Sequence, residues 1–396
     1  MCSTFIMTTT DPFRELREEL DARAAEGLLR KRRIIAGKQQ PALLADGEDM
    51  LSFCSNDYLG LASHPALIAA VQQAAQEVGV GGGASHLITG HHRLHHELEE
   101  ALAHFVGMPR ALFFSTGYMA NLGVISALAG RGDAIFADRL NHASLNDAAV
   151  LSRADLHRYP HNDVAALEKQ LARSTARRKL VVADAVFSMD GDIAPVPQLL
   201  ELCERYDAWL MLDDAHGFGV LGAHGKGTLE HFGVHGPRII YMATLGKAAG
   251  VSGAFVAGES ELVEYLIQRA RTYIYTTAMP PVLAAALLAA LPIIEKETSR
   301  REQLQTLIAT LRGNLKPKQW RLDESITPIQ PLIIGSNEDA LRVSEHLRER
   351  GILVPAIRPP TVPQGTARLR ITLSAAHTVE DVMRLVNALH AAEGAQ

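Results

Sequence analysis

Short apolar runs alternate with amphipathic stretches through the middle of the chain. Runs typical of buried strands lie at residues 111–114, 134–137, 179–183 and 209–212. Between them, apolar residues recur at helical spacing in residues 97–105, 118–128, from 144 onward and 198–206. Such alternation predicts an α/β fold with a mostly parallel sheet that helices cover on both faces.

The two ends of the chain differ from this middle. Residues 11–34 are predicted to form one amphipathic helix that packs across a larger body, because Phe13, Leu16 and Leu20 begin a helical apolar stripe. After about residue 290 a helix-rich stretch precedes predicted strands and helices at 329–334, 340–350, 353–357, 368–373 and 379 onward. We therefore predict three regions: an N-terminal helix and arm (1–60), a large domain (61–290) and a smaller C-terminal α+β domain (291–396).

Composition narrows the class of protein. With 396 residues, 47% of them hydrophobic, and 31 glycines, the chain suits a compact enzyme. Its net charge of −5 argues against nucleic-acid binding. Three cysteines without paired spacing argue against a disulfide framework and favour a reducing cytoplasm. No stretch approaches the roughly 20 apolar residues of a membrane span, so no membrane partner is expected. The residues before Asp11 are expected to be poorly ordered.

The sequence singles out Lys247 as the most reactive position. It lies among small residues just after the apolar run 239–242, where a desolvated amine can form a Schiff base with an aldehyde. Earlier in the chain, Asp213 ends another apolar strand, and His216 follows three positions on. A strand-end acid together with a strand-end lysine favours pyridoxal phosphate (PLP), whose ring nitrogen needs an acidic partner and whose aldehyde needs an amine.

Other candidates fall at predicted strand ends, where α/β sheets bind their ligands. Gly117 begins a helix whose N–H groups can hold a phosphate, although an ordinary Ser/Thr cap is the alternative. His142 lies at a strand-to-helix turn, where its ring can stack on a planar cofactor or only cap the helix. Ser188 and Thr244 follow predicted strands and are expected near the same edge of the sheet.

Two clusters invite other interpretations. Four histidines lie close together, but no cysteine or acid completes a ligand set with zinc-motif spacing, so the sequence favours a partly exposed helical face and no metal site; they are His91, His92, His95 and His96. The glycine-rich segment 79–85 lacks dinucleotide-binding spacing and is expected to be a flexible loop near the site.

Six motifs together give a specific resemblance. They are NDYLGL at 56–61, DRLNHAS at 138–144, FSMDGD at 187–192, DDAHG at 213–217, TLGK at 244–247 and SAAHT at 374–378. Over nearly the whole chain, this set resembles the α-oxoamine synthases, which are PLP-dependent transferases of fold type I. The resemblance implies a homodimer whose active sites are shared between subunits.

The resemblance also implies roles for individual residues. Those expected in catalysis are Lys247, His142, Asp213 and His216. Those expected to hold the cofactor are Gly117, Tyr118, His142, Ser188, Asp213, His216, Thr244, Lys247, Thr276 and Thr277, the two threonines reaching the neighbour's phosphate. Those expected at the substrate are Arg30, Asn56, His142, Thr361 and Arg370. By strand alternation Arg368 shares a face with Arg370, so the choice between the two rests on the family pattern.

Within the family, AIRPPTVP at 356–363 and RLR at 368–370 most resemble acyltransferases that condense L-alanine with a pimeloyl thioester in biotin biosynthesis. The acyl carrier there is coenzyme A or acyl carrier protein, and the choice stays open. Alternatives are an α-oxoamine synthase that uses glycine or serine, and a fold type I aminotransferase. A PLP-bound DNA-binding regulator is disfavoured, because it needs an added basic domain.

Overall fold

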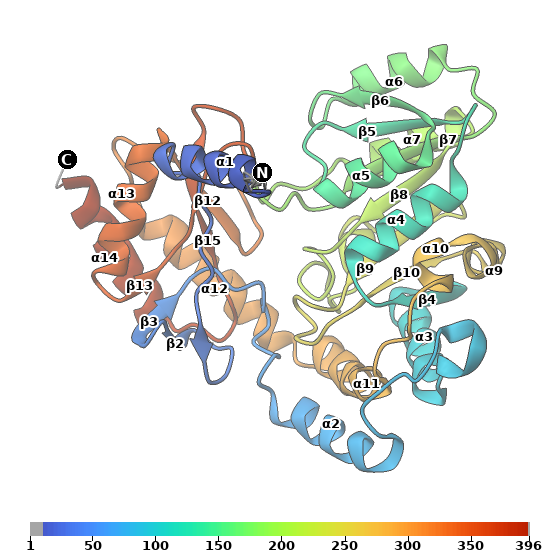
Figure 1. Ribbon diagram of the computed structural model, residues 1–396, viewed down its shortest axis with the longest axis horizontal. Helices are drawn as coiled ribbons and strands as arrows, with labels where there is room; N and C mark the ends of the chain where they lie inside the picture. The colour runs from blue at the N-terminus through green and yellow to red at the C-terminus, as the bar shows by residue number, and fades with distance from the viewer. Residues whose placement is uncertain (1–10, 395–396) are drawn as a thin grey trace, which may run out of the picture.

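The computed structural model describes residues 11–394, which form two lobes (Figure 1). The larger lobe is built on a seven-stranded sheet of order β4-β10-β9-β8-β7-β5-β6. Its strands are β4 (Arg110–Phe114), β5 (Ala134–Asp138), β6 (Asp155–Tyr159), β7 (Lys179–Asp184), β8 (Trp209–Asp213), β9 (Ile239–Thr244) and β10 (Ala254–Gly258). All neighbours pair in parallel except β10, which is antiparallel to both β4 and β9. The predicted mostly parallel α/β sheet is confirmed.

Helices cover both faces of this sheet because both faces are apolar. In β8, Leu210 and Leu212 belong to one hydrophobic core while Met211 belongs to the other, as strand alternation requires. The helices of this lobe are α2 (Pro65–Val78), α3 (Arg93–Val106), α4 (Gly117–Leu128), α5 (Ala143–Ser152), α6 (Val164–Arg173), α7 (Val196–Arg205), α8 (Thr228–Phe232), α9 (Ser260–Arg269), α10 (Arg271–Ile274) and α11 (Pro281–Lys296), with a π-helical turn, η1 (His86–Gly90), before α3.

Several of these elements escaped the sequence analysis. Strand β6 (DLHRY) is an edge strand with exposed polar residues, so it lacks the apolar run of the central strands. Helix α6, which follows it, and strand β10 were also missed. Strand β10 runs antiparallel to β9 because the connection between them, residues 245–253, is too short for a crossover helix; it also pairs antiparallel with β4, which is far away in sequence.

The smaller lobe is α+β, as predicted. Its elements are α12 (Thr298–Asn314), β11 (Arg321–Leu322), β12 (Ile329–Gly335), α13 (Asn337–Arg348), β13 (Ile352–Leu353), β14 (Ala356–Ile357), β15 (Ala367–Thr372) and α14 (Val379–Gly394). Four of them form an antiparallel sheet of order β11-β12-β15-β14. The single strand predicted at 353–357 is wrong: β13 and β14 belong to different sheets, and Pro355, which has no N–H to donate, separates them.

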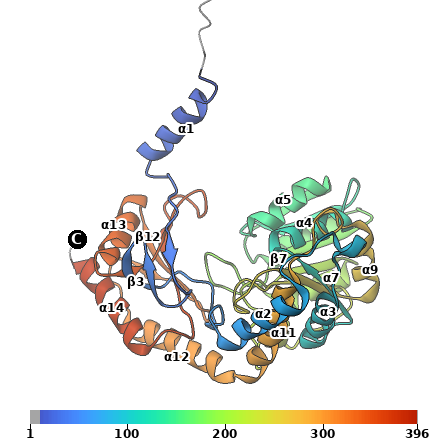
Figure 2. The same cartoon turned by 60° about the horizontal axis from the view of Figure 1, so that its bottom comes forward.

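The N-terminal segment contains α1 (Arg14–Ala25), β1 (Ile35–Ala36), β2 (Ala42–Ala45) and β3 (Glu48–Ser52). The helix predicted over 11–34 is too long, because α1 ends before Gly27, whose φ of 66° is left-handed. None of its residues is buried, and it projects from the body (Figure 2). The expectation that it packs across the body is therefore wrong for a single chain.

The first three strands join the C-terminal part of the chain rather than the large sheet. They form a sheet of order β1-β2-β3-β13, in which β3 and β13 pair in parallel. The predicted division into regions at 60 and 290 stays a prediction. The expectation about residues before Asp11 lies outside the described residues. None of the helices within 11–394 is both long and apolar enough to cross a membrane.

Candidate active site

A cavity of about 200 Å³ opens at the carboxyl ends of β7, β8 and β9, beside the first turn of α4. Eight predicted site residues line it: Gly117, Tyr118, His142, Ser188, Asp213, His216, Thr244 and Lys247. Five further residues share the lining: Asn121, Ser144, Asp184, Ala215 and Met242. Parallel strands thus bring together residues that are up to 130 positions apart in the chain, Gly117 and Lys247.

Lys247 sits in a tight turn after β9. The turn closes through a 2.9 Å hydrogen bond from the N–H of Gly250 to the carbonyl of Lys247. Gly250 has a φ of 71°, and a Cβ there would lie 2.5 Å from the carbonyl carbon of Leu61, so only glycine fits. Burial, with a smaller contribution from the positive charge of Arg370, lowers the pKa of Lys247 to about 8. Its amine therefore loses a proton more readily than an exposed lysine.

A chain of hydrogen bonds runs inward from this amine. Nζ of Lys247 lies 2.7 Å from Nε2 of His216, whose Nδ1 lies 2.5 Å from the hydroxyl of Tyr58. The Tyr58 hydroxyl donates to Oδ1 of Asn56 at 3.2 Å, so Nδ1 of His216 is the donor to Tyr58 and Nε2 the acceptor from Lys247. Burial lowers the pKa of His216 well below its usual value, helped by the charges of Lys247 and Arg370. The imidazole is therefore neutral.

The two adjacent aspartates have different surroundings. Asp213 faces the cavity, where its carboxylate accepts hydrogen bonds from Asn121 Nδ2 at 2.7 Å and from the N–H of Ala215 at 3.0 Å. Asp214 does not line the cavity; it accepts from the N–H and hydroxyl of Thr228 and from the hydroxyl of Tyr241. Asp213 is thus the carboxylate available to a ligand.

Asp184 is a second buried acid in the cavity wall. It ends β7, one strand away from Asp213, and accepts a 2.8 Å hydrogen bond from the N–H of His142. Burial and the nearby charge of Asp213 raise the pKa of Asp184 well above its usual value. The carboxyl group of Asp184 therefore loses its proton less readily than that of an exposed aspartate.

The structure shows the capping role of His142 and places its ring in the cavity wall, while stacking on a cofactor stays a prediction. Its Nδ1 accepts from the N–H of Ser144 at 3.3 Å, which caps α5, while its ring lines the cavity. The first turn of α4 is similar. Thr116 caps the helix through the N–H of Met119 at 3.1 Å. The N–H groups of Gly117 and Tyr118 have no acceptor within residues 11–394, so this helix end can hold an anion.

Two arginines on β15 have separate partners. Arg370 donates to the carbonyl of Ser188 at 2.6 Å and to Oδ1 of Asn56 at 3.3 Å, whereas Arg368 forms an ion pair with Asp190 at 2.6 Å. Both guanidinium groups are buried. Arg370 is therefore the one joined to the hydrogen-bond chain of Lys247.

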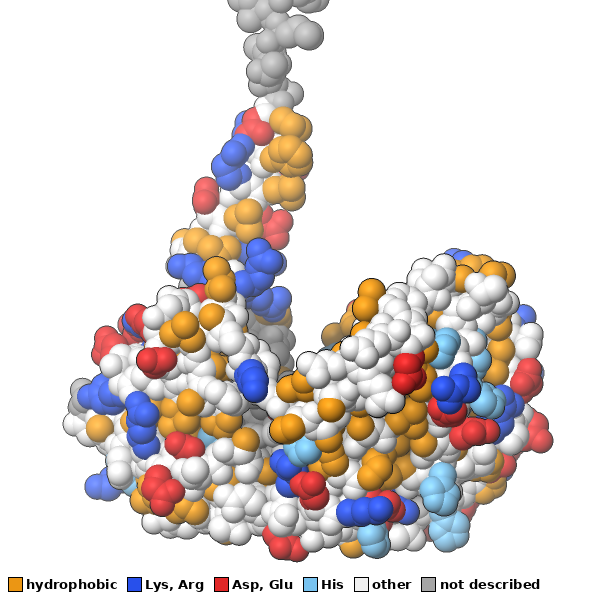
Figure 3. Space-filling view, turned by 90° about the horizontal axis from the view of Figure 1, so that it is seen from below, with side chains coloured by type: hydrophobic (Ala, Val, Ile, Leu, Met, Phe, Trp, Pro, Cys, Tyr) orange, Lys and Arg blue, Asp and Glu red, His pale blue; other side chains and the backbone are white. Residues whose placement is uncertain are grey.

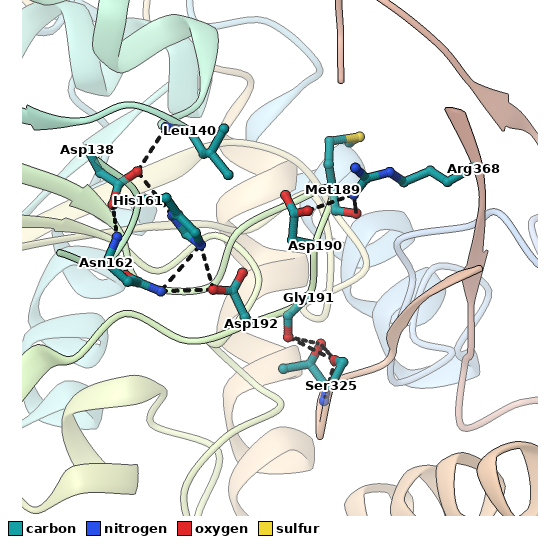
Figure 4. A network of polar contacts seen from close by, with 11 residues as sticks. Asp138, Leu140, His161, Asn162, Met189, Asp190, Gly191, Asp192, Ser325 and Arg368 are labelled. Carbon is teal, nitrogen blue, oxygen red and sulfur yellow. Dashed lines mark hydrogen bonds and ion pairs between the residues drawn. The ribbon is translucent and has the colours of Figure 1, made fainter. Parts of the chain in front are cut away.

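A network outside the cavity holds the 187–192 loop, which carries Ser188 (Figure 4). His161 lies 3.1 Å from Oδ1 of Asp138 and 2.7 Å from Oδ2 of Asp192. The hydroxyl of Ser325 donates to the carbonyl of Gly191 at 2.8 Å. Burial lowers the pKa of His161, but the hydrogen bonds and charges of Asp138 and Asp192 outweigh it and raise that pKa to about 10. The loop is thus tied to both lobes.

Other predicted residues do not line the cavity. Asn56 and Arg370 lie behind its wall: Asn56 is linked to the lining residue His216 through Tyr58, and Arg370 contacts the carbonyl of the lining residue Ser188. Four more predicted residues lie elsewhere on this chain. Three of them, Arg30, Thr277 and Thr361, are exposed, and Thr276 is half-buried.

The sequence analysis gave no role to several residues that form the site. Asp184 could have been found, because it ends an apolar strand in the same way as Asp213. Tyr58 lies within a motif that was recognised. Asn121 gave no signal, because a polar residue inside a helix is usually exposed.

Comparisons with known proteins identify the family. The sequence model of aminotransferase class I and II matches residues 48–389. An 8-amino-7-oxononanoate synthase from Methylobacillus flagellatus is 65% identical over 380 residues, which cover 96% of each chain. Another from Nitrosospira multiformis is 64% identical over 374 residues, 94% of each chain. The chain belongs to the 8-amino-7-oxononanoate synthases.

Solved structures agree with this family assignment. Serine palmitoyltransferase from S. paucimobilis, in a variant with a bound PLP–myriocin adduct, matches with a TM-score of 0.91 at 31% identity, covering 97% of this chain and 98% of that one. An 8-amino-7-oxononanoate synthase from Francisella tularensis matches with a TM-score of 0.75 at 32% identity, covering 86% and 96%. The chain is therefore a PLP-dependent acyltransferase of fold type I, as the resemblance implied.

The cavity fits PLP chemically. It combines a buried amine and a buried carboxylate with a helix N-terminus where two N–H groups have no acceptor among the described residues, and these match an aldehyde, a ring nitrogen and a phosphate. In addition, Oδ1 of Asn121 is buried in its wall without a hydrogen-bond partner among the described residues. A buried unpaired oxygen in a wall of this kind is consistent with a bound polar group.

Proposed function

We propose that this enzyme condenses L-alanine with a pimeloyl thioester to give 8-amino-7-oxononanoate for biotin biosynthesis. A C–C bond forms between the alanine α-carbon and the thioester carbonyl carbon, the C–S bond breaks, and carbon dioxide and the free thiol carrier leave. The observation that carries the proposal is the buried Lys247 amine in one cavity with Asp213 and His216, in a chain 65% identical to a named synthase.

We assign the cofactor contacts as follows. When bound, PLP supplies an electron sink that stabilises negative charge at the substrate α-carbon. Lys247 would hold its aldehyde carbon, Asp213 its ring nitrogen and His216 its phenolic oxygen, while the ring of His142 would lie on its face. The phosphate or the ring edge would be held by Gly117, Tyr118, Ser188 and Thr244.

Two groups of this chain act on the substrate in the proposal. Nζ of Lys247, with its pKa lowered to about 8, takes the proton from the alanine α-carbon, because a base works best with a pKa near the working pH. The guanidinium of Arg370 binds the alanine carboxylate. Its bonds to Ser188 and Asn56 fix its orientation in advance, so little freedom is lost on binding.

The predicted residues that lie outside the cavity lead to a proposal about assembly. Arg30, Thr276, Thr277 and Thr361 lie outside the cavity of their own chain. We propose a homodimer in which the two threonines approach the phosphate of the neighbouring site, while Arg30 and Thr361 approach substrate. Acyl carrier protein is proposed as an alternative acyl donor to coenzyme A. Cys54 and Cys203 are free thiols, which supports a reducing cytoplasm as the proposed location.

The acyl group is where the alternatives differ. Three prolines stiffen residues 358–363, so we propose that Thr361 and its apolar neighbours form one rigid wall of the acyl channel. The test is to supply the PLP-loaded enzyme with each amino acid and each acyl thioester and to identify products by mass. Alanine with pimeloyl thioester should exceed glycine with succinyl or acetyl thioester at least tenfold in kcat/KM, about 1.4 kcal/mol.

The opposite ranking would assign the chain to another α-oxoamine synthase activity and leave the role of Lys247 intact. Turnover without any thioester would support an aminotransferase.

A further inference from the structure

The histidines at the start of α3 form a cluster that the reaction does not use. We propose that His91, His96 and Glu99 bind a divalent cation, with Zn²⁺ as the best match, at a site separate from the cofactor cavity. Their candidate ligand atoms all lie within 4.8 Å of one another. His96 and Glu99 are three residues apart on α3 and therefore share a face, while His91 lies just before the helix.

Buried neighbours orient two of the three ligands. Nδ1 of His91 lies 3.1 Å from Nδ1 of His86, which leaves Nε2 of His91 free, 3.9 Å from Oε2 of Glu99. Oε1 of Glu99 accepts the N–H of Phe113 at 2.9 Å, which leaves Oε2 free. The ring of His86 is stacked on Tyr273 at 4.7 Å between centroids. Such fixed outer partners are what metal-binding histidines and carboxylates normally have.

A second cluster, of His86, His91 and His95, meets the same distance limit but is a poorer candidate. Nε2 of His95 lies 2.9 Å from the carbonyl of Met279, and its Nδ1 accepts the N–H of His92 at 3.1 Å, so both nitrogens are used. His92 caps α3 through the N–H of Leu94. The predicted partly exposed helical face is therefore wrong for His95, which is fully buried.

The chemistry of the three ligands suits zinc. Two imidazole nitrogens and one carboxylate oxygen are one of the protein ligand sets that bind Zn²⁺ and leave a fourth tetrahedral position for water. Glu99 is the acid that sequence spacing did not associate with the histidines.

The site can be reached from solvent. His91 and His96 are both exposed, and histidine side chains gather with charged side chains on the surface of the large lobe (Figure 3). Without a cation, Nε2 of His96 lies 3.4 Å from Oε1 of Glu100. Such an exposed pair contributes little to stability, so it does not prevent His96 from turning to a cation.

The experiment titrates Zn²⁺ into the PLP-loaded enzyme by calorimetry. We expect one Zn²⁺ per chain at this site, and the affinity should fall at least tenfold in His91→Gln and in His96→Gln. His104→Gln is the matched control, because His104 is exposed on the same helix outside the cluster, and it should leave the affinity unchanged.

Absence of binding would overturn the proposal. So would equal affinity in wild type and both variants, because the ion would then sit at the cofactor or a thiol. Circular dichroism shows that each variant is folded, and zinc-edge anomalous diffraction from soaked crystals gives an independent readout. None of these outcomes depends on the substrate assignment, since all are measured without substrate.

Discussion

At the scale of single residues, reactivity depends on neighbours that are distant in sequence. The amine of Lys247 is joined through His216 and Tyr58 to Asn56, which also accepts from Arg370. The proposed base and the proposed carboxylate-binding group therefore share one hydrogen-bond chain. A change at either end should be measurable at the other.

The first prediction concerns the apoenzyme and its reaction with PLP. Below its pKa Lys247 is an ammonium ion and cannot attack an aldehyde, so the rate of cofactor uptake should rise with pH around a midpoint near 8. In Arg370→Gln the midpoint should move up, because a nearby positive charge that favours the neutral amine is lost. Stopped-flow absorbance measures both rates.

Arg238→Gln is the control for that shift, since Arg238 lies at the opposite end of β9. A midpoint near the ordinary lysine value of about 10.4 in wild type would contradict the prediction. Borohydride reduction and peptide mapping should place the pyridoxyl group on Lys247.

The second prediction separates the two aspartates. Asp213→Asn should stay folded and lose activity at least 100-fold, because a preorganised charge beside the cofactor is removed. Asp214→Asn should lower the free energy of unfolding by about 1–3 kcal/mol. The new NH2 group would face a hydrogen-bond donor of Thr228 or Tyr241, so one buried hydrogen bond would be lost. Urea unfolding and steady-state kinetics distinguish them. A stable, inactive Asp214→Asn beside an active Asp213→Asn would reverse the assignment.

At the scale of elements, the site depends on loops as much as on strands. The 187–192 loop gives its Ser188 carbonyl to Arg370, and His161 joins the loop to the end of β5. Because the two acids hold His161 in its charged form, the loop is tied by an ion pair that is only partly exposed to solvent.

The third prediction tests this tie through the pH dependence of stability. The pKa of His161 is about 10 in the folded chain and about 6.5 when unfolded, so its stabilisation is complete below pH 6.5 and is lost as pH rises toward 10. His161→Gln should therefore cost a few kcal/mol of unfolding free energy at pH 6.5 and much less at pH 10. His104→Gln is the control. A difference that does not change with pH would refute the ion pair.

At the scale of the whole molecule, a single chain exposes apolar side chains and predicted site residues that nothing among the described residues covers. The apolar side chains of α1, Phe13, Leu16 and Leu20, are more than half exposed, at 64%, 56% and 52%. Thr276 and Thr277 lie outside their own cavity. A second copy that covers such surfaces and receives such residues accounts for both observations.

The fourth prediction is that two inactive variants restore each other. Coexpressed Lys247→Ala and Thr277→Glu chains should form mixed dimers in which one of the two sites has both native residues. Random pairing then gives up to about one quarter of wild-type activity. Lys247→Ala with Asp213→Asn is the matched control: both residues belong to the same chain's cavity, so no site is restored. Absence of recovery in isolated mixed dimers would contradict shared sites.

The sequence by itself determined the local elements and the chemistry at strand ends. Apolar runs and helical periodicity are local properties, so the central strands and the helices between them could be predicted from these patterns. The positions of Lys247, Asp213 and His216 at strand ends could be predicted in the same way. The six motifs indicated the family, because they contain the residues that are expected to contact the cofactor.

Only the tertiary structure decided what depends on contacts between distant segments. The pairing of β10 with β4 and the division of 353–357 between two sheets left no clear local pattern. The same holds for the pairing of Tyr58 with His216, of Arg370 rather than Arg368 with Asn56, and of Glu99 with His91. Each of these contacts depends on the distance between two side chains. The packing of the folded chain sets that distance, and the order of residues in the sequence does not.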